Sequence, residues 1–528
     1  MARQQRPARS RALAPILAAL LWLAGCATSP PPADRAYSAR VAESVFAKAY
    51  SDIFDKYLQP LDLDEIAFDG IGGLVSIDAG YAASRKDGMV RIALAGSELG
   101  RFPLPRSNDV ETWAQLTTRI IDLSRTRSAA IRTATEEEIY KGVLGGAVSR
   151  LDRHSRYAGL RSARDYRAQR EGFGGIGVQL NFDHELPQII SVVPDSPAQA
   201  TNIQPGDVIV AIGNEPVDDL GRREVIWRLR GDVDTEVDVT LTRKSLAQPF
   251  AVRLRRALIV SPTVHVRREA STAIINITGF NQRTARNLTR TLKRLFAGNG
   301  PEITGIVLDL RGNPGGLLDQ AVAVADSFLD HGRVVSTRGR HPDSFQIFNA
   351  GGRDLARGLP VAVLINGQSA SASEIVAAAL QDQGRAVVVG SNSYGKGTIQ
   401  SITRLPNDGE LILTWSRFHA PTGYALQNLG VMPNFCTSAP RPGAGGAAAH
   451  TEMSLETSIV LTAWRNHLGY DAKSAKDLRE RCPRRAEAPA ADITVAREVL
   501  ADRSLYARAI GASNPWIARN KDDRGARR

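Results

Sequence analysis

The sequence is poor in the residue patterns that bind metals or cofactors. It has 528 residues but only three Cys and eight His, and it contains neither an HExxH motif nor paired Cys ligands. No metal or other cofactor is therefore predicted. Long basic blocks are also absent, because 67 Lys and Arg residues are scattered among 55 Asp and Glu residues. The net charge of +12 thus gives no indication of nucleic-acid binding.

One apolar stretch near the amino terminus, residues 12–24, is too short to cross a bilayer comfortably. It follows a basic segment and ends in small residues, which predicts a signal peptide at residues 1–25. The closing LAGC resembles a bacterial lipobox, whose cysteine, here Cys26, is lipidated. Ala27 follows, as in proteobacterial lipoproteins sent to the outer membrane. We therefore expect a lipoprotein of the bacterial cell envelope that faces the periplasm and is held in a membrane by its N-terminal lipid. The outer membrane is favoured.

Two cysteines remain after Cys26, namely Cys436 and Cys482. An exported protein folds in an oxidising compartment, where two thiols commonly pair, so a Cys436–Cys482 disulfide is predicted. Two separate buried thiols are the alternative, because the sequence alone does not show whether the sulfurs meet.

Apolar periodicity and turn residues divide the mature chain into several parts. Two amphipathic helices are expected near residues 38–58 and 136–157, and the segment 66–135 between them looks inserted. The sequence EIAFDGIGGLVSIDAGY weakly resembles the later sequence EEIYKGVLGGAVSRLDRHSRY, as in an internal duplication. Short β-branched runs follow, and then strands alternating with helices. The predicted parts are a Pro-rich linker (26–37), a helical N-terminal or cap region with an insertion (38–171), a β-rich domain (172–258), an α/β core (259–436), a linker (437–452) and a C-terminal helical appendage (453–528).

A candidate catalytic serine lies where the apolar strand VAVLIN enters a Gly-, Ser- and Ala-rich turn that opens into a helix. Such a turn displays a side chain, and the free N–H groups at a helix start can hold a developing oxyanion. A serine nucleophile needs a base, yet none of the eight His residues lies in a comparable turn. Lys396, in the Gly-flanked loop SYGKG, is the alternative base, provided that desolvation lowers its pKa.

Three motifs, SASASEI, GKGTIQ and LDLRGNPGG, together resemble those of the carboxyl-terminal processing peptidases, also called tail-specific proteases. The resemblance implies a crotonase-like α/β peptidase core with helical N- and C-terminal segments. It also implies Ser371 as the nucleophile, Lys396 as the general base and Gln400 as the residue that orients it. The N–H groups of Gly316 and Ala372 would form the oxyanion hole, while the other serines of SASAS would be structural.

The β-rich domain resembles a PDZ domain through FGGIGVQL and IQPGDVIVAIGNEPV. The resemblance implies that backbone groups of a carboxylate-binding loop and strand hold a substrate tail as an added strand, and that Arg230 regulates the active site. A solvated surface arginine is the alternative for Arg230. The family pattern is broken at Arg153, where Pro is usual, and at Asn202, where Gly is common. The tail-binding residues would be Gly175, Ile176, Gly177 and Val178.

These patterns predict an envelope serine endopeptidase that recognises C-terminal tails and hydrolyses peptide bonds through an acyl-enzyme. Its expected partners are protein substrates with exposed C-terminal tails and, as regulators, an adaptor protein or further copies of the chain. A non-hydrolytic PDZ scaffold of the envelope is the alternative, disfavoured by the intact Ser371, Lys396 and Gln400. A crotonase-like acyl-CoA enzyme is disfavoured by the export signal and the PDZ resemblance.

Overall fold

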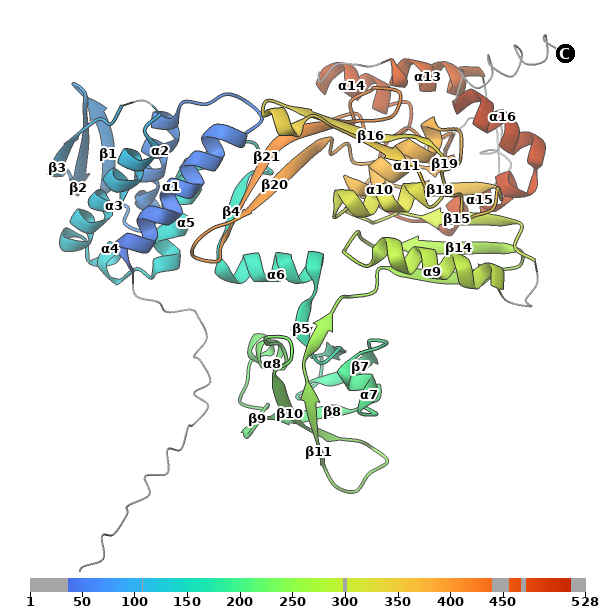
Figure 1. The fold of residues 1–528 in the computed structure, drawn as a ribbon, viewed down its shortest axis with the longest axis horizontal. Coiled ribbons are helices and arrows are strands. Elements are labelled where there is room, and N and C mark those ends of the chain that lie inside the picture. Colours follow the sequence, from blue (N-terminus) through green and yellow to red (C-terminus); the bar gives the residue numbers. More distant parts are fainter. Residues whose placement is uncertain (1–36, 107, 298–301, 439–454, 467–471, 514–528) are drawn as a thin grey trace, which may run out of the picture.

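The computed structural model describes residues 37–106, 108–297, 302–438, 455–466 and 472–513. Figure 1 shows an N-terminal cap at one end, an α/β core at the other, and a β-rich domain that projects between them. The predicted signal peptide, Cys26 and most of both linkers lie outside the described residues. Within those residues, no helix combines the length and the apolar character needed to cross a membrane.

The cap is a helical layer with a small antiparallel sheet, and the sheet was not expected from the sequence. Tight turns at Asp87-Gly88 and Ala95-Gly96 connect its strands, and all four of these residues have positive φ. Asp-Gly between strand-forming runs is a hairpin signal, so this sheet could have been predicted. The cap elements are α1 (Ala39–Lys56), α2 (Leu63–Gly72), η1 (Gly73–Ser76), β1 (Tyr81–Lys86), β2 (Met89–Leu94), β3 (Ser97–Pro103), α3 (Val110–Arg127), α4 (Ala129–Thr133) and α5 (Glu136–Ala147).

The segment that looked inserted shares one apolar core with the helices on either side of it. Its α2 packs against α5, and the two segments that echo each other in sequence meet at their glycines. A Cβ on Gly73 would lie 2.0 Å from the carbonyl oxygen of Gly142, and one on Gly146 would lie 2.2 Å from that of Asp69. The glycines therefore allow close backbone approach between these two helical segments.

The β-rich domain contains a sheet in the order β11-β10-β8-β7-β6, with β9 paired to β8. Its core is built from alternating inward residues such as Ile209, Val239 and Leu241. Asn202, at a position where Gly is common, has a φ of 60°, which Asn tolerates better than most residues. The elements are β5 (Phe173–Gly175), β6 (Val178–Asn181), β7 (Gln188–Val192), α7 (Pro197–Ala200), β8 (Val208–Ile212), β9 (Glu215–Pro216), α8 (Arg222–Leu229), β10 (Glu236–Thr242), β11 (Phe250–Arg255) and β12 (Ala257–Ile259).

The core is a sheet in the order β13-β14-β15-β18-β19-β22, parallel except for β13. Strands β15, β18 and β19 are buried throughout, as expected when helices cover both faces of a parallel sheet. Its strands are β13 (Val264–Glu269), β14 (Thr272–Ile277), β15 (Gly305–Asp309), β18 (Val361–Ile365), β19 (Val387–Gly390) and β22 (Phe435–Cys436), and the helices on one face are α9 (Thr284–Ala297), α10 (Leu318–Asp326) and α11 (Ala372–Asp382).

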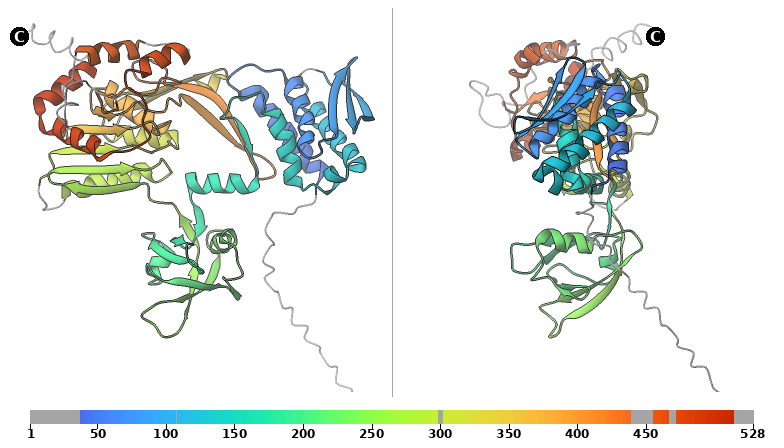
Figure 2. Two further views of the ribbon diagram at one scale, coloured as in Figure 1. Left: turned by 180° about the vertical axis from the view of Figure 1, so that it is seen from behind. Right: turned by 90° about the vertical axis from the view of Figure 1, so that its left-hand side faces the viewer.

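The C-terminal helices form part of the core, although the sequence had suggested an appendage. Val495, Val499 and Leu500 pack on the second face of the central sheet, in one cluster with Val307 and Leu364. Figure 2 shows these helices, in red, against the core and away from the cap. They are α13 (Leu455–Arg465), α14 (Ala472–Arg479), α15 (Ala490–Ala501) and α16 (Arg503–Ser513).

A second sheet, in the order β17-β16-β21-β20, joins the core to the cap, with β4 paired to β21. Leu405, Leu411 and Leu413 of the β20–β21 hairpin are buried in the core of the cap. The hairpin therefore runs from the cap to the loop that contains Lys396 (Figure 1). The remaining elements are β4 (Arg156–Ala158), α6 (Leu160–Glu171), β16 (Gly332–Gly339), η2 (Pro342–Ser344), β17 (Gln346–Ala350), β20 (Thr398–Arg404) and β21 (Glu410–His419).

Candidate active site

Ser371 lies in a strained turn between β18 and α11, which we call the nucleophile turn (366–371). It precedes the first residue of α11 and has a φ of 57° and a ψ of −116°. A non-glycine residue in such a conformation is costly and needs support from the surrounding structure. Support comes from the buried carboxylate of Glu374, which accepts a 2.7 Å hydrogen bond from the Ser371 N–H. The turn leaves Ser371 partly exposed.

Glu374 joins the nucleophile turn to the loop that contains Lys396, here called the base loop (391–397). Its carboxylate also accepts hydrogen bonds from the Ser393 hydroxyl at 2.6 Å and from the N–H groups of Gly395 and Lys396 at 2.6 and 3.0 Å. Burial raises the pKa of Glu374, while these hydrogen bonds and the one from Ser371 oppose the shift. Sequence reasoning missed Glu374, although S-x-x-E at a helix start is a recognisable capping pattern.

Lys396 is half-buried, and its pKa is lowered chiefly by desolvation and further by the charge of Arg156. The charges of Glu374 and Asp152 oppose the shift. Among the described residues, no hydrogen bond or ion pair holds the Lys396 Nζ. A buried amine without an ion pair is more readily neutral, and only the neutral amine can accept a proton. The pKa of nearby His154 is lowered chiefly by burial and further by the charge of Lys396.

The structure brings Ser371 and Lys396 into one site, but no hydrogen bond joins their side chains within the described part of the chain. No described hydrogen bond joins Gln400 to Lys396 either, although the resemblance implies that Gln400 orients this lysine. Its amide donates to the hydroxyls of Thr398 and Thr414, at 3.1 and 3.2 Å. A register shift between Ile399 and Gln400 places Gln400 opposite Thr414 in the β20–β21 ladder. This local geometry explains the different partner.

The residues predicted to form the oxyanion hole lie beside Ser371. Gly315 has a φ of 104°, and a Cβ there would approach the Ser371 Cβ to 2.8 Å. Gly316 has a φ of 148°, and a Cβ there would lie 2.1 Å from the carbonyl oxygen of Phe280. Both positions therefore require glycine. No hydrogen bond described in the structure uses the N–H of Gly316 or Ala372, so both groups are available to a negatively charged oxygen.

Polar side chains hold the loop of Gly316, here called the oxyanion loop (310–316), against the nucleophile turn. The buried Asn313 accepts a 2.9 Å hydrogen bond from the Gly315 N–H. The Ser369 hydroxyl donates to the Leu310 carbonyl oxygen at 2.8 Å, and the Ser373 hydroxyl donates to that of Asn313 at 2.9 Å. The hydroxyls of Ser369 and Ser373 thus bind backbone carbonyl oxygens of the oxyanion loop.

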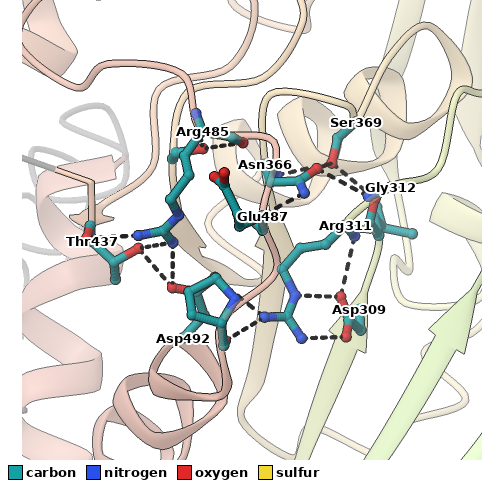
Figure 3. Close-up of polar contacts among 12 residues, drawn as sticks. Asp309, Arg311, Gly312, Asn366, Ser369, Thr437, Arg485, Glu487 and Asp492 are labelled. Atoms are coloured by element: carbon teal, nitrogen blue, oxygen red, sulfur yellow. Dashed lines mark hydrogen bonds and ion pairs between the residues drawn. The ribbon is translucent and has the colours of Figure 1, made fainter.

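Arg311 extends the support of the oxyanion loop to the C-terminal helices (Figure 3). Its guanidinium donates two hydrogen bonds to Asp309, at 2.8 and 2.7 Å. It also donates to the carbonyl oxygen of Pro489 at 2.8 Å and to Asp492 at 3.2 Å. Sequence reasoning did not single out Asp492, because 178 to 181 residues separate these partners from Arg311.

A polar cavity of about 310 Å³ borders the base loop, between the cap and the β20–β21 hairpin. Thr398 and Gln427 line it on the core side, and Tyr57 lines it on the cap side. Asp152 and His154 also line the cavity.

The predicted tail-binding residues surround the start of β6, the edge strand of its sheet in the described structure. Gly177 has a φ of 86°, and a Cβ there would lie 2.2 Å from the Ser196 Cβ. The carbonyl oxygens of Ile176 and Gly177 accept hydrogen bonds from Ala198 and Val193. Gly175 pairs with β12, and Val178 pairs with β7. The loop is therefore held from within the domain, and β6 keeps one edge open.

Arg230 lies at the junction between α6 and the β-rich domain. Its guanidinium stacks 4.1 Å from the centre of the Phe173 ring and lies 3.5 Å from the Asp165 carboxylate. Burial lowers its pKa, and Asp165 opposes this shift. These partners belong to the connection between domains and not to the catalytic loops.

Cys436 and Cys482 are joined by a disulfide with a Cα–Cα distance of 5.9 Å. Cys436 ends β22, and Cys482 lies in the segment between α14 and α15. The disulfide therefore connects an edge of the central sheet with the C-terminal helical region.

The chain is similar to two known protein families and to several known proteins. The family model Peptidase family S41 matches residues 271–437, and the PDZ domain model matches residues 174–254. A carboxy-terminal-processing protease of Bartonella bacilliformis is 34% identical over 339 residues, which cover 64% of this chain and 78% of that protein. A carboxyl-terminal-processing protease of Picosynechococcus is 32% identical over 334 residues, which cover 62% of this chain and 79% of that protein.

Among solved structures, a photosystem II D1 C-terminal processing protease is 21% identical, with a TM-score of 0.38. The alignment covers 74% of this chain and 92% of that chain. The sequence comparisons confirm the family expected from the motifs, and they confirm the PDZ domain. The chain belongs to peptidase family S41, among the carboxyl-terminal processing serine proteases.

Proposed function

We propose that this protease captures the free C-terminal tail of an envelope protein with its PDZ domain and cleaves the chain with Ser371 and Lys396. The observation that carries this proposal is the position of Glu374. One buried carboxylate binds the backbone N–H groups of both Ser371 and Lys396. A strained serine, a lysine of lowered pKa and two available N–H groups are thereby gathered in one site.

In the proposed reaction, neutral Lys396 accepts the proton of the Ser371 hydroxyl as its oxygen attacks the peptide carbonyl carbon. The N–H groups of Gly316 and Ala372 hold the resulting oxyanion. The C–N bond then breaks, and the ammonium of Lys396 returns its proton to the leaving amine. Water attacks the acyl-enzyme ester with Lys396 again as the base, which releases a carboxylate and restores Ser371.

The side chains of Ser371 and Lys396 must come closer before this reaction starts. Catalytic hydrogen bonds are often long in the free enzyme and shorten in the substrate complex. In this proposal Gln400 would help to orient Lys396, because it lies on the strand that directly follows the base loop. We infer that bound substrate completes the contact between Ser371 and Lys396.

The open edge of β6 supports tail recognition by the PDZ domain. An extended peptide can add to such an edge as a further strand, and its carboxylate can bind the backbone N–H groups around Gly175, Ile176 and Gly177. Val178 would then pair with the tail. Arg230 would transmit this event, since it contacts both α6 and Phe173 at the domain junction.

The proposed site of action is the bacterial cell envelope, on the periplasmic side of a membrane. The support is the predicted signal peptide and the LAGC sequence ending in Cys26. An adaptor protein or self-association would regulate access of tails to the active site.

The test is cleavage of an unstructured peptide with a free C-terminal carboxylate by the soluble protein. Wild type should cleave the peptide, whereas Ser371→Ala and Lys396→Ala should bind the tail without cleaving it. The same peptide with an amidated C-terminus should be cleaved less well. Tail binding by wild type without any cleavage would indicate a non-hydrolytic scaffold instead.

A further inference from the structure

The segment 479–492, which runs from the last residue of α14 into the first turn of α15, contacts the oxyanion loop, the nucleophile turn and the base loop. We call it the C-terminal clamp. We propose that the clamp is a positioning element of the active site and that Asp492, Arg485, Arg484 and Arg479 are its positioning residues. This inference rests on the proposed catalytic function of Ser371 and Lys396.

The clamp holds the oxyanion loop through Asp492. The Asp492 carboxylate is fully buried and accepts hydrogen bonds from Arg311 at 3.2 Å, Arg485 at 2.8 Å and the Thr437 hydroxyl at 2.7 Å (Figure 3). Arg311 also reaches the carbonyl oxygen of Pro489. Asp492 therefore links the clamp, the loop of Gly316 and the end of the sheet at Thr437.

The clamp holds the nucleophile turn through its own backbone. The Arg485 carbonyl oxygen accepts a 2.7 Å hydrogen bond from the Gly367 N–H. The buried Asn366 donates to the carbonyl oxygen of Ala486 at 2.7 Å and accepts from the Gly312 N–H at 2.9 Å. Asn366 thus joins the clamp to the turn of Ser371 and to the oxyanion loop (Figure 3).

The clamp holds the base loop through two guanidinium groups. Arg479 donates to the carbonyl oxygens of Ser393 and Tyr394, at 3.4 and 3.2 Å. Arg484 donates to the Tyr394 carbonyl oxygen at 3.2 Å, and its guanidinium lies 5.5 Å from the centre of the Tyr394 ring. Tyr394 is two residues before Lys396, so these contacts act on the backbone that carries the base.

The composition of the loops explains why they need an external support. Gly312, Gly315, Gly316 and Gly395 all have positive φ. Glycine-rich backbone has large conformational freedom, which must be restricted if catalytic groups are to keep their geometry. Planar guanidinium groups suit this task, because each can donate several hydrogen bonds in fixed directions. The clamp supplies such donors to the backbone of these glycine-containing loops.

The first test is Asp492→Asn, which keeps the size of the side chain but removes the charge that two arginines bind. We expect kcat on a tailed peptide to fall about 10- to 100-fold, since small displacements of catalytic groups have large effects on rate. KM should stay within about two-fold of the wild-type value, because no hydrogen bond or ion pair of the described residues joins the clamp to the PDZ domain. Tail affinity, measured in proteins that also contain Ser371→Ala, should likewise stay within about two-fold. The matched control is Asp477→Asn, an exposed position on α14.

The second test uses exposed Arg484, whose replacement leaves the buried Asp492 network in place. Arg484→Ala should lower kcat several-fold, and Arg484→Lys should restore part of the loss by keeping a cation and a donor. Arg503→Ala, an exposed arginine on α16, is the control. Thermal unfolding of each variant shows whether the protein being assayed is folded. If Asp492→Asn does not fold, the Arg484→Ala and Arg484→Lys variants decide the test.

Wild-type kcat in folded Arg484→Ala, or in folded Asp492→Asn, would overturn the inference. So would a loss of activity that only follows the unfolded fraction. Ser371→Ala is measured in parallel to separate the two proposals. If Ser371→Ala cleaves like wild type, the proposed function fails; if it is inactive while the clamp variants are fully active, only the positioning inference fails.

Discussion

Glu374 is buried and Lys396 is half-buried, and among the described residues no ion pair joins their side chains. Both carboxylate oxygens of Glu374 are occupied by backbone N–H groups and the Ser393 hydroxyl. An ion pair with the amine would favour its charged form and oppose its use as a base. Glu374 instead accepts a hydrogen bond from the Lys396 N–H, while desolvation lowers the pKa of the Lys396 amine.

Cleavage should rise with pH through the lowered pKa of Lys396 and then level, because deprotonation creates the base. Lys396→Arg should be inactive despite its charge, since a guanidinium stays protonated. Peptide cleavage against pH for wild type and this variant is the measurement. Activity lost in a folded protein after any single His→Ala substitution would point to a histidine base instead; the positions to test are His154, His265, His331 and His419.

Glu374→Gln should lower kcat by about 100-fold, because an amide cannot accept all the hydrogen bonds that the carboxylate accepts and its own N–H would face other donors. Unfilled buried donors should also lower the free energy of unfolding by about 1–3 kcal/mol. Glu498→Gln, an exposed change on α15, is the control for kinetics and urea unfolding. A folded Glu374→Gln protein with wild-type kcat would contradict the proposed position of Glu374 at the centre of the site.

At the scale of elements, each catalytic group lies in a loop at the end of a buried parallel strand. The oxyanion loop follows β15, the nucleophile turn follows β18, and the base loop follows β19. These three strands are neighbours in one sheet, so their carboxyl ends meet at one edge. Helices α15 and α16 pack on the second face of this sheet, and the disulfide joins β22 to the clamp.

Cys436→Ser should lower the free energy of unfolding by about 2–4 kcal/mol, because the disulfide closes a long loop in the unfolded chain. Denaturant unfolding with and without reductant should show this difference for wild type and none for the variant. Alkylation of both thiols in native, non-reduced protein, detected by mass spectrometry, would show that the disulfide does not form.

Arg230→Ala should reduce the stimulation of cleavage by a tailed substrate while leaving the affinity of the PDZ domain for the tail unchanged. The physical reason is the loss of the bridge between Phe173 and Asp165, which connects the domain to α6. Cleavage of the tailed peptide and of its amidated form measures the effect. Arg222→Ala, on α8 within the same domain, is a matched control, and equal stimulation in Arg230→Ala and wild type would exclude the proposed link.

At the scale of the whole molecule, the PDZ domain projects from the body that holds the cap and the core (Figures 1 and 2). It connects through the short β5–β12 ladder and α6, so few contacts restrain it relative to the catalytic loops. The β20–β21 hairpin provides a different connection, from the base loop to the buried core of the cap. Tail binding and substrate entry can therefore act on the site from separate directions.

Cys26→Ala should release the mature protein from the membrane fraction, because a diacylated cysteine is the anchor expected from the lipobox and two acyl chains bind stably to a bilayer. Fractionation of cells that express wild type or the variant is the measurement, and Cys482→Ser serves as a cysteine control. Complete membrane retention of Cys26→Ala would show that another feature anchors the protein.

Local patterns in the sequence were enough to predict the family, the PDZ domain and the strand–turn–helix around Ser371. These features depend on short-range periodicity and on glycine positions, which can be read directly along the chain. Glu374 and the Asp-Gly hairpin of the cap were also visible in the sequence but were not recognised. The positions of Ser371, Lys396 and Gly316 in one site follow from the order of parallel strands in the sheet.

Only the tertiary structure decided the partners of Gln400 and the place of the C-terminal helices. The Gln400 contacts depend on a register shift between paired strands, which no local pattern encodes. Asp492 reaches Arg311 across 181 residues because α15 packs on the second face of the sheet. Such long-range contacts arise from burial of apolar surface that the helix and the sheet share, so the sequence determined each element but not which surfaces meet.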